Sequence, residues 1–197
     1  MGSEMTKFLY LVGAPATGKS SVMREIYNQL GVVTGDWYKI HPTTHAEFRG
    51  EPMTDVITGE YRGLSLGVTR LGFSGTDAIG MASSSEAQAW IESDDELPEL
   101  ILGEGSRLTI GKFFAAVAQR CDLTIGHLVA GKEVLDARCE ARGSQQSETF
   151  RKSGATRAVN ACAVAAKAGA SILELDTTEY DPVMLANILL SAAEISL

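Results

Sequence analysis

The sequence predicts a three-layer α/β domain in which helices cover both faces of a five-stranded parallel sheet. Three observations lead to this fold class. The chain has 197 residues, 45% of them hydrophobic, which suits one domain with a substantial core. Short apolar runs alternate with helical patterns, as is typical of parallel sheets. A glycine-rich segment joins the first apolar run to the first helical pattern. We therefore expect residues 1–197 to form a single domain.

Five short apolar runs are expected to form the strands of this sheet. Each has the length and composition of a strand that is buried on both faces. The runs lie at residues 8–12, 37–40, 100–102, 123–129 and 172–175.

Helices are expected between these runs and after the last one. The first covers residues 20–30, where apolar residues at helical spacing share one face and Gly31 is placed to end the helix. Another carries the apolar residues of 113–118. The last begins after Asp181, because proline suits a first helical position and Pro182 occupies it.

Between these elements the pattern changes. Residues 43–80 show glycine, threonine, serine and isolated apolar residues, so we expect a long irregular region that forms the acceptor site. Ser83 and Glu86 match a capping box ahead of a helical stretch at 87–91. Residues 1–6 are expected to be a disordered start.

Composition excludes several classes of protein. The chain has 17 basic and 25 acidic residues, and its net charge of −8 argues against a protein that coats DNA or membranes. The three cysteines have no C-x-x-C spacing, which favours free thiols and a reducing, cytosolic location. No apolar stretch is long enough to span a membrane.

A phosphate-binding motif follows the first expected strand. Residues 13–20, GAPATGKS, match G-x-x-x-x-G-K-[ST] at every fixed position. In such a loop, backbone amides and the start of the next helix bind phosphate oxygens, the lysine reaches the β- and γ-phosphates, and the serine hydroxyl binds Mg²⁺. We therefore expect ATP with Mg²⁺ to bind here, on Gly13, Ala14, Ala16, Thr17, Gly18, Lys19, Ser20 and Ser21.

Glu104 follows the apolar run at 100–102, which places a carboxylate at the end of a buried strand where open α/β sheets bind ligands. There it is either a ligand of Mg²⁺ and its water, together with Ser20, or a solvated glutamate in a turn. Arg107, three residues on, faces either the phosphates or solvent.

Residues 138–157 contain five basic and two acidic residues, a net charge of +3 within an acidic chain. Arg138 and Arg142 are four residues apart, so one helical face can present both. Such a segment suits a lid that closes over the γ-phosphate, because guanidinium groups stabilise the charge of phosphoryl transfer. The alternative is a solvated helix with ordinary surface charges.

Asp77 lies in the region expected to be irregular. Its carboxylate is either a general base that takes the proton of an acceptor hydroxyl, or the cap of a short helical turn that begins at Ala78.

Taken together, these segments resemble a known family. The strand, phosphate-binding loop and helix, with Glu104 and the arginine-rich segment, look like the nucleoside and nucleotide kinases. More narrowly, the chain resembles phage and actinobacterial P-loop kinases, among them those that phosphorylate 5-hydroxymethyluracil in phage DNA. The narrower resemblance lies in residues 71–78 (LGFSGTDA), 103–107 (GEGSR) and 141–146 (ARGSQQ).

The resemblance implies a P-loop NTPase fold with strand order 2-3-1-4-5, Asp77 as the base, and Glu104 and Arg142 in the site. It points to DNA with a hydroxymethylated base as the acceptor. Phe48, Tyr61 and Phe73 are each either available to stack on such a base or part of the core. A nucleoside, a nucleoside monophosphate or another small hydroxyl acceptor is the alternative, and an ATPase module without an acceptor is a second. The resemblance implies a more basic, glycine-containing lid than residues 150–157 offer, which leaves the roles of Arg151 and Arg157 open. The oligomeric state is left open.

Overall fold

A computed structural model of the protein describes residues 5–40, 48–69, 75–80, 82–143 and 147–196. Its strands are β1 (Thr6–Val12), β2 (Val32–Thr34), β3 (Tyr38–Lys39), β4 (Arg49–Asp55), β5 (Tyr61–Leu66), β6 (Leu100–Glu104), β7 (Cys121–Val129) and β8 (Ser171–Asp176). Its helices are α1 (Lys19–Leu30), the 3₁₀ turn η1 (Gly75–Ala78), α2 (Ser83–Glu92), α3 (Gly111–Arg120), α4 (Lys132–Ala141), α5 (Glu148–Lys167) and α6 (Pro182–Ala192).

One mixed sheet forms the middle layer. The five strands β5-β6-β1-β7-β8 are parallel and lie side by side in that order, which is 2-3-1-4-5 when the parallel strands are numbered along the chain. Outside β5, the antiparallel strand β4 pairs with β5, and both β2 and β3 pair with β4. The predicted class and the order of the parallel strands are confirmed, while the described part of the sheet has eight strands instead of five.

The second parallel strand is not the predicted one. Residues 38 and 39 form only the short strand β3 at the sheet margin, and the parallel position is taken by β5. The stretch 43–80 therefore contains β4, β5 and η1 and is not the irregular region that we expected. Proline and glycine within β4 and β5 hide the strand pattern in the sequence, because both residue types usually interrupt strands.

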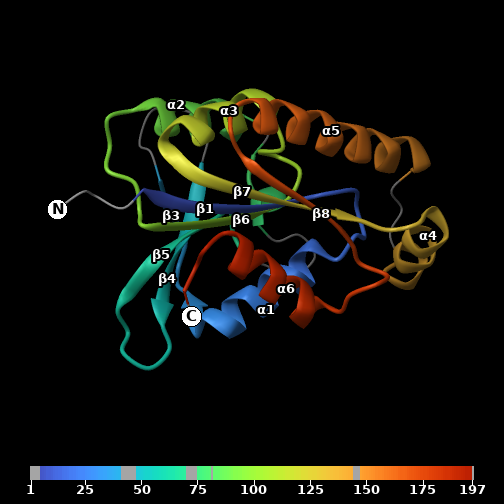
Figure 1. Ribbon diagram of the computed structural model, residues 1–197, viewed down its shortest axis with the longest axis horizontal. Helices are drawn as coiled ribbons and strands as arrows, with labels where there is room; N and C mark the ends of the chain where they lie inside the picture. Colours follow the sequence, from blue (N-terminus) through green and yellow to red (C-terminus); the bar gives the residue numbers. More distant parts are fainter. Residues whose placement is uncertain (1–4, 41–47, 70–74, 81, 144–146, 197) are drawn as a thin grey trace.

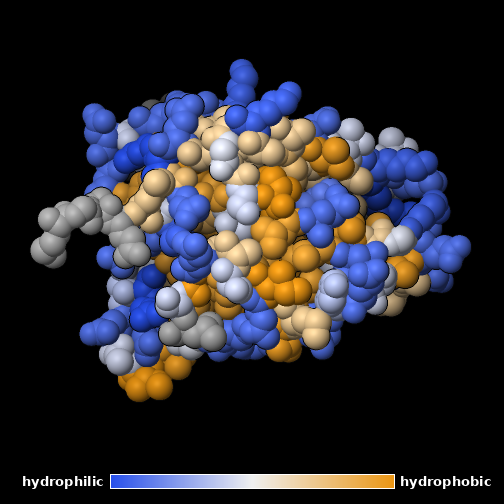
Figure 2. Space-filling model, in the orientation of Figure 1, coloured by the Kyte–Doolittle hydropathy of each residue, from blue (hydrophilic) through white to orange (hydrophobic). Residues whose placement is uncertain are grey.

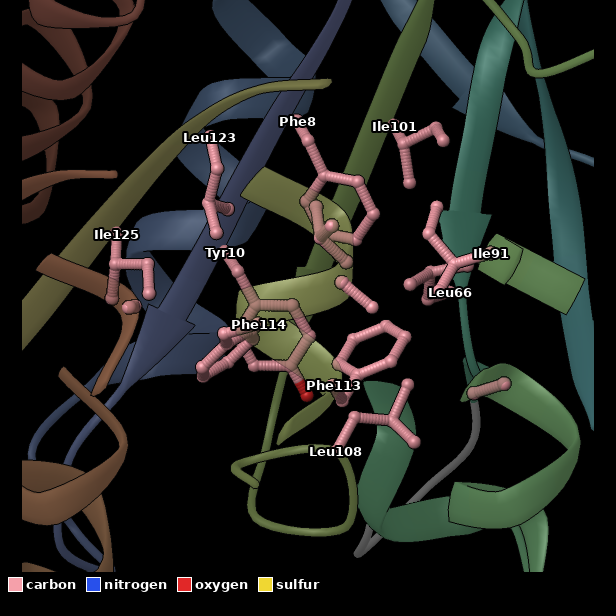
Figure 3. Close-up of a cluster of buried hydrophobic side chains, with 14 of the residues drawn as sticks. Phe8, Tyr10, Leu66, Ile91, Ile101, Leu108, Phe113, Phe114, Leu123 and Ile125 are labelled. Carbon is pink, nitrogen blue, oxygen red and sulfur yellow. The ribbon is translucent and has the colours of Figure 1, made fainter. Parts of the chain in front are cut away.

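Helices cover both faces of the sheet. In Figure 1, α2, α3 and α5 lie above it and α1 and α6 below it, while α4 lies beyond the carboxyl ends of the parallel strands. Successive residues of β1 alternate between the two cores: Phe8 and Tyr10 pack under α3, and Leu9 and Leu11 pack against α1 and α6. Figure 3 shows the first of these cores, in which Phe114 lies against the ring of Tyr10.

Helix ends follow local chemistry, with one exception. Gly31 ends α1 with a φ of 61°, and Asp181 caps α6 by accepting a hydrogen bond from the Met184 amide at 2.8 Å, both as predicted. The predicted capping box is wrong, because α2 begins at Ser83 and the residue at the cap is Ala82.

The chain start, the surface and the cysteines complete the description of the fold. Thr6, expected in the disordered start, is the first residue of β1. Figure 2 shows hydrophobic residues at the tip of the β4–β5 hairpin, where Val56 and Ile57 are exposed. No helix in the described ranges is both long and apolar enough to cross a membrane. The three cysteines are free thiols, as predicted, and all three are buried.

Candidate active site

The P-loop, residues 13–20, connects β1 to α1 and turns tightly in front of the N-terminus of that helix. Three of its residues have left-handed backbone angles: Gly13 at a φ of 147°, Ala16 at 67° and Gly18 at 90°. A Cβ on Gly13 would lie 2.3 Å from the Leu128 carbonyl oxygen, so only glycine fits there. The loop thus gathers all eight predicted nucleotide-binding residues where backbone N–H groups and the helix dipole attract phosphate.

Lys19 lies folded over this loop. Its ammonium group donates hydrogen bonds to the carbonyl oxygens of Gly13 at 3.1 Å and Ala14 at 3.0 Å, and the residue is only 9% exposed. Burial lowers the pKa of Lys19 below its ordinary value, and the nearby carboxylates of Glu104 and Asp77 oppose that shift. The lysine is therefore held beside the phosphate-binding amides before any ligand binds.

Ser20 and Glu104 meet at the start of α1. The Ser20 hydroxyl donates a hydrogen bond of 2.7 Å to the Glu104 carboxylate. The sheet register explains this contact, because β1 pairs with β6 so that Leu11 lies opposite Glu104, the last residue of β6. Glu104 is 5% exposed and is therefore not the solvated turn residue of the alternative interpretation. A hydroxyl and a carboxylate are oxygen donors of the kind that Mg²⁺ prefers, so these residues fit that ion.

Asp77 approaches the same strand end from η1. Its Oδ1 atom accepts two hydrogen bonds of 2.7 Å, from the backbone N–H and the hydroxyl of Ser106, just beyond β6. Its Oδ2 atom has no hydrogen-bond partner among the described residues. Asp77 lies inside the 3₁₀ turn and bonds across to Ser106, 29 residues later, so its carboxylate does not act as the cap of that turn.

A buried tyrosine that the sequence analysis did not single out supports this arrangement. The hydroxyl of Tyr10 lies 2.8 Å from the Thr76 hydroxyl and donates to the Gly105 carbonyl oxygen at 3.2 Å. The Thr76 hydroxyl in turn lies 3.0 Å from the Glu104 carbonyl oxygen. Burial raises the pKa of Tyr10 well above its ordinary value, so the hydroxyl stays neutral. In Figure 3 the Tyr10 oxygen points out of the apolar cluster.

The two glycines on either side of residues 68–74 touch. A Cβ on Gly67 would lie 2.0 Å from the carbonyl carbon and oxygen of Gly75, and the Val68 amide donates to that oxygen at 3.1 Å. On the β5 side, the buried carboxylate of Glu51 accepts hydrogen bonds from the Thr69 amide at 2.6 Å and hydroxyl at 2.8 Å. Residues 70–74, which include Phe73 and the first half of the motif LGFSGTDA, lie outside the described residues.

Arg138 faces the P-loop backbone. Its guanidinium donates to the Thr177 hydroxyl at 2.8 Å, to the Thr177 carbonyl at 3.0 Å and to the Ala16 carbonyl at 3.4 Å. It therefore connects the P-loop to the segment that follows β8. Thr177 is another residue that the sequence did not reveal, because nothing in its local pattern signals a partner 39 residues away.

The other arginines separate in space. α4 ends at Ala141, so Arg142 follows the helix instead of sharing a full turn with Arg138, yet its charge lowers the pKa of Lys19. Arg151 forms an ion pair of 2.8 Å with Asp136, and Arg107 donates to the Ile79 carbonyl at 3.3 Å, away from the P-loop. Arg157 lines a cavity beside α3.

α5 nevertheless touches the P-loop. A Cβ on Gly154 would lie 3.2 Å from the Cδ atom of Pro15, so a residue near the end of the predicted lid packs on the loop itself. Of the aromatic residues expected to stack on a base, Phe48 is fully buried and packs on Trp90, whereas Tyr61 is 54% exposed. Phe48 is therefore a core residue, which was one of its two expected roles.

Comparisons with known proteins agree with this geometry. A family model described as "P-loop Nucleotide Kinase3" matches residues 4–183. No curated protein matches the sequence.

Similar solved structures include an unliganded sugar kinase from Janibacter sp. HTCC2649, at 13% identity, a TM-score of 0.46, and coverage of 97% of this chain and 96% of that one. Another is shikimate kinase from Acinetobacter baumannii in complex with shikimate, at 14% identity, a TM-score of 0.49, and coverage of 98% and 96%.

Proposed function

Because the chain belongs to the P-loop nucleotide kinase family, we propose that it transfers the γ-phosphate of ATP to the hydroxymethyl group of 5-hydroxymethyluracil in DNA. The observation that carries the kinase assignment is that three functional groups meet at the carboxyl ends of the neighbouring strands β1 and β6. Lys19 lies over the P-loop, Ser20 bonds to Glu104, and Asp77 is held by the residue two places beyond Glu104. A phosphate site, a metal site and a base thus adjoin one another, as phosphoryl transfer needs.

On the donor side, the P-loop amides and Lys19 would bind the phosphates. Lys19 would exchange its bonds to the two loop carbonyls for bonds to phosphate oxygens, which carry more charge. Ser20 and Glu104 would hold Mg²⁺, which when bound offsets the charge of the β- and γ-phosphates. Arg138 would act as a positioning residue for the loop, and Arg142 would add a second positive charge near Lys19.

On the acceptor side, Asp77 would take the proton. The acceptor oxygen attacks the γ-phosphorus, the bond from that phosphorus to the bridging oxygen of ADP breaks, and the hydroxyl proton passes to Oδ2 of Asp77. The two hydrogen bonds from Ser106 fix Oδ1 and so orient the carboxylate. Because the base acts at the transferred proton and not on ATP, it should affect turnover more than nucleotide binding.

The choice of DNA rests on the resemblance and on local charge. Residues 138–157 carry a net charge of +3, and affinity for a polyanion follows the phosphates that are contacted. Tyr61 does not support this choice, because it begins β5 and so lies at the amino end of the parallel strands, away from Asp77 and the P-loop at their carboxyl ends. The net charge of −8 favours a second candidate, a free nucleoside or nucleoside monophosphate, for which an acidic surface is no obstacle.

One experiment tests both the reaction and the acceptor. Radiolabelled ATP is incubated with 5-hydroxymethyluracil supplied as polymer DNA, as the free nucleoside and as the monophosphate. Label in the polymer that falls steeply with added salt supports the proposal. Label only in the nucleoside or monophosphate replaces it with the second candidate. Inorganic phosphate as the only product in all three incubations contradicts the kinase and favours an ATPase module.

A further inference from the structure

An open cavity of about 550 Å³ lies between the start of α3 and the middle of α5, and the side chains of Ser153, Thr156, Arg157 and Asn160 in it are exposed to solvent. We call it the α3–α5 cavity. It belongs to neither the P-loop nor the Ser20–Glu104 pair. Its walls combine one guanidinium group, several neutral polar side chains and a few apolar ones: Thr109, Ile110, Gly111, Ser153, Thr156, Arg157, Asn160, Ala161 and Val164.

The charge in this cavity comes from Arg157. Among the described residues Arg157 forms no hydrogen bond and no ion pair, whereas Arg138 bonds to Thr177 and Arg151 pairs with Asp136. No Asp or Glu is among the lining residues. The cavity therefore holds a guanidinium whose donors remain available, and a guanidinium binds carboxylate and phosphate oxygens by paired hydrogen bonds.

Neutral donors complete the lining. Ser153, Thr156 and Asn160 lie on the same helix as Arg157, at spacings that place them on neighbouring turns. On the opposite wall α3 begins without a side-chain cap, so its first backbone N–H groups have no intrahelical acceptor. A Cβ on Gly111 would lie 2.9 Å from the Val164 side chain, so glycine lets the two helices approach and form the cavity floor.

The cavity adjoins the candidate active site on two sides. The Thr109 hydroxyl donates to the Gly105 carbonyl at 2.7 Å, and Gly105 precedes Ser106, which holds Asp77. On α5, Ser153 precedes Gly154, which packs on Pro15 of the P-loop. A molecule that places a hydroxyl at Asp77 thus has the α3–α5 cavity beside it.

We propose that the α3–α5 cavity binds an anionic group of the phosphate acceptor, a phosphate or a carboxylate, and that Arg157 is the residue that recognises it. That the bound molecule is the phosphate acceptor rests on the proposed kinase function, but binding of an anion in the cavity can be tested without turnover. In a nucleoside monophosphate the group is the 5′-phosphate, and in DNA it is a phosphate of the backbone. The cavity then selects acceptors that carry charge beside the reactive hydroxyl.

The kinetic test compares acceptors with and without such a group. Arg157→Met should raise KM for 5-hydroxymethyldeoxyuridine monophosphate, or for the oligonucleotide, at least about tenfold, because a charge-assisted hydrogen bond is lost. It should leave KM for ATP and for the free nucleoside within about twofold. The matched control is Lys167→Met, which removes the same charge from the exposed end of α5 and should change none of these constants. Equal loss with charged and uncharged acceptors would show a structural effect and overturn the proposal.

A binding test separates this site from the proposed reaction. Inorganic phosphate is titrated into ¹⁵N-labelled protein saturated with Mg²⁺ and a non-hydrolysable ATP analogue, so that the P-loop is filled. The amide of Gly111 and the Nε resonance of Arg157 should shift and saturate, and Arg157→Met should abolish the shift at Gly111 while Lys167→Met preserves it. If no acceptor is phosphorylated and this result is obtained, the hydroxymethyluracil proposal fails and the anion site stands. Shifts that survive Arg157→Met, or none in the wild type, would overturn the site.

Discussion

The P-loop and the arginine segment 138–157 both place positive charge near the carboxyl ends of the parallel strands, but they differ in where their hydrogen-bond partners lie in the sequence. In the P-loop, the lysine, the hydroxyls and the backbone amides come from one short stretch, and Lys19 and Thr17 bond to carbonyl groups of that stretch. In the arginine segment, two guanidinium groups bond to different residues outside the segment: Arg138 to Thr177 and Arg151 to Asp136. Arg157 has no such partner among the described residues.

The difference teaches which kind of site can be recognised in a sequence. Backbone angles and a helix start encode the P-loop, so spacing alone identifies it. A guanidinium can anchor a loop, pair with a carboxylate or bind a ligand, and the choice depends on what the fold brings near it. Four arginines that look alike in the sequence therefore divide into different structural roles.

The largest expected effect tests the P-loop. Lys19→Ala should lower turnover by about 10³-fold or more, because the charge nearest the transferred phosphate is lost. Transfer of radiolabel from ATP to the acceptor measures it, with Lys167→Ala as the control for removal of a lysine from the surface. Retained transfer in a folded Lys19→Ala protein would contradict the assignment of the P-loop as the donor site.

A smaller effect is expected at Asp77. Asp77→Asn should lower kcat by about 10²- to 10⁴-fold, the usual contribution of a general base, with KM for ATP unchanged. Steady-state kinetics with varied ATP measures both constants, and Asp122→Asn on the opposite end of the sheet is the matched control. A parallel rise in KM for ATP would indicate instead that Asp77 acts in nucleotide binding.

Arg138 and Arg151 allow two kinds of arginine contact to be compared within residues 138–157. Arg138→Met should weaken ATP binding about tenfold, because the P-loop loses a charged donor at Ala16 and its connection to Thr177. Arg151→Met loses an ion pair that is partly exposed and should weaken binding less than twofold. Titration of a fluorescent ATP analogue compares the two variants, and equal effects would show that the segment acts through total charge alone.

The smallest effect concerns the hydrogen bonds that join β1, the strand before the P-loop, to η1 and the end of β6. Tyr10→Phe keeps the ring packing on Phe114 but removes the hydroxyl that bonds to Thr76 and Gly105. It should lower the free energy of unfolding by about 1–2 kcal/mol, because buried polar groups lose a partner. Urea denaturation measures this change, and Tyr180→Phe, at a more exposed tyrosine, should be neutral. An unchanged midpoint for Tyr10→Phe would show that the network adds no stability.

Much of the fold was accessible from the sequence because local signals agreed with the tertiary structure. The apolar run of β1, the helical face of α1 and the cap of α6 at Asp181 are each decided within a few residues. β5 was missed because Gly63 and Ser65 break its pattern. Gly63 is needed there, since a Cβ would lie 2.3 Å from the Leu100 carbonyl oxygen of β6. Glycine is required at this position because of packing against β6, which lies far along the chain. The residues around Gly63 in the sequence give no indication of that requirement.

The candidate site divides in the same way. The motif predicted every P-loop residue, and the strand pattern located Glu104 at the sheet edge beside Ser20. The supports were not predictable, because the Ser106–Asp77 and Tyr10–Thr76 bonds join residues 29 and 66 positions apart. Only the parallel arrangement of β1 beside β6 brings such residues together.

The contact between Gly67 and Gly75 has a consequence for substitutions at either glycine. A Cβ on Gly67 would lie 2.0 Å from the Gly75 carbonyl group, and a Cβ on Gly75 would lie 2.6 Å from the Glu104 carbonyl oxygen. Both residues also have a positive φ, which favours glycine. A side chain at either position would therefore push the end of β5, the start of η1 and the end of β6 apart, and it would displace Asp77 without touching its carboxylate.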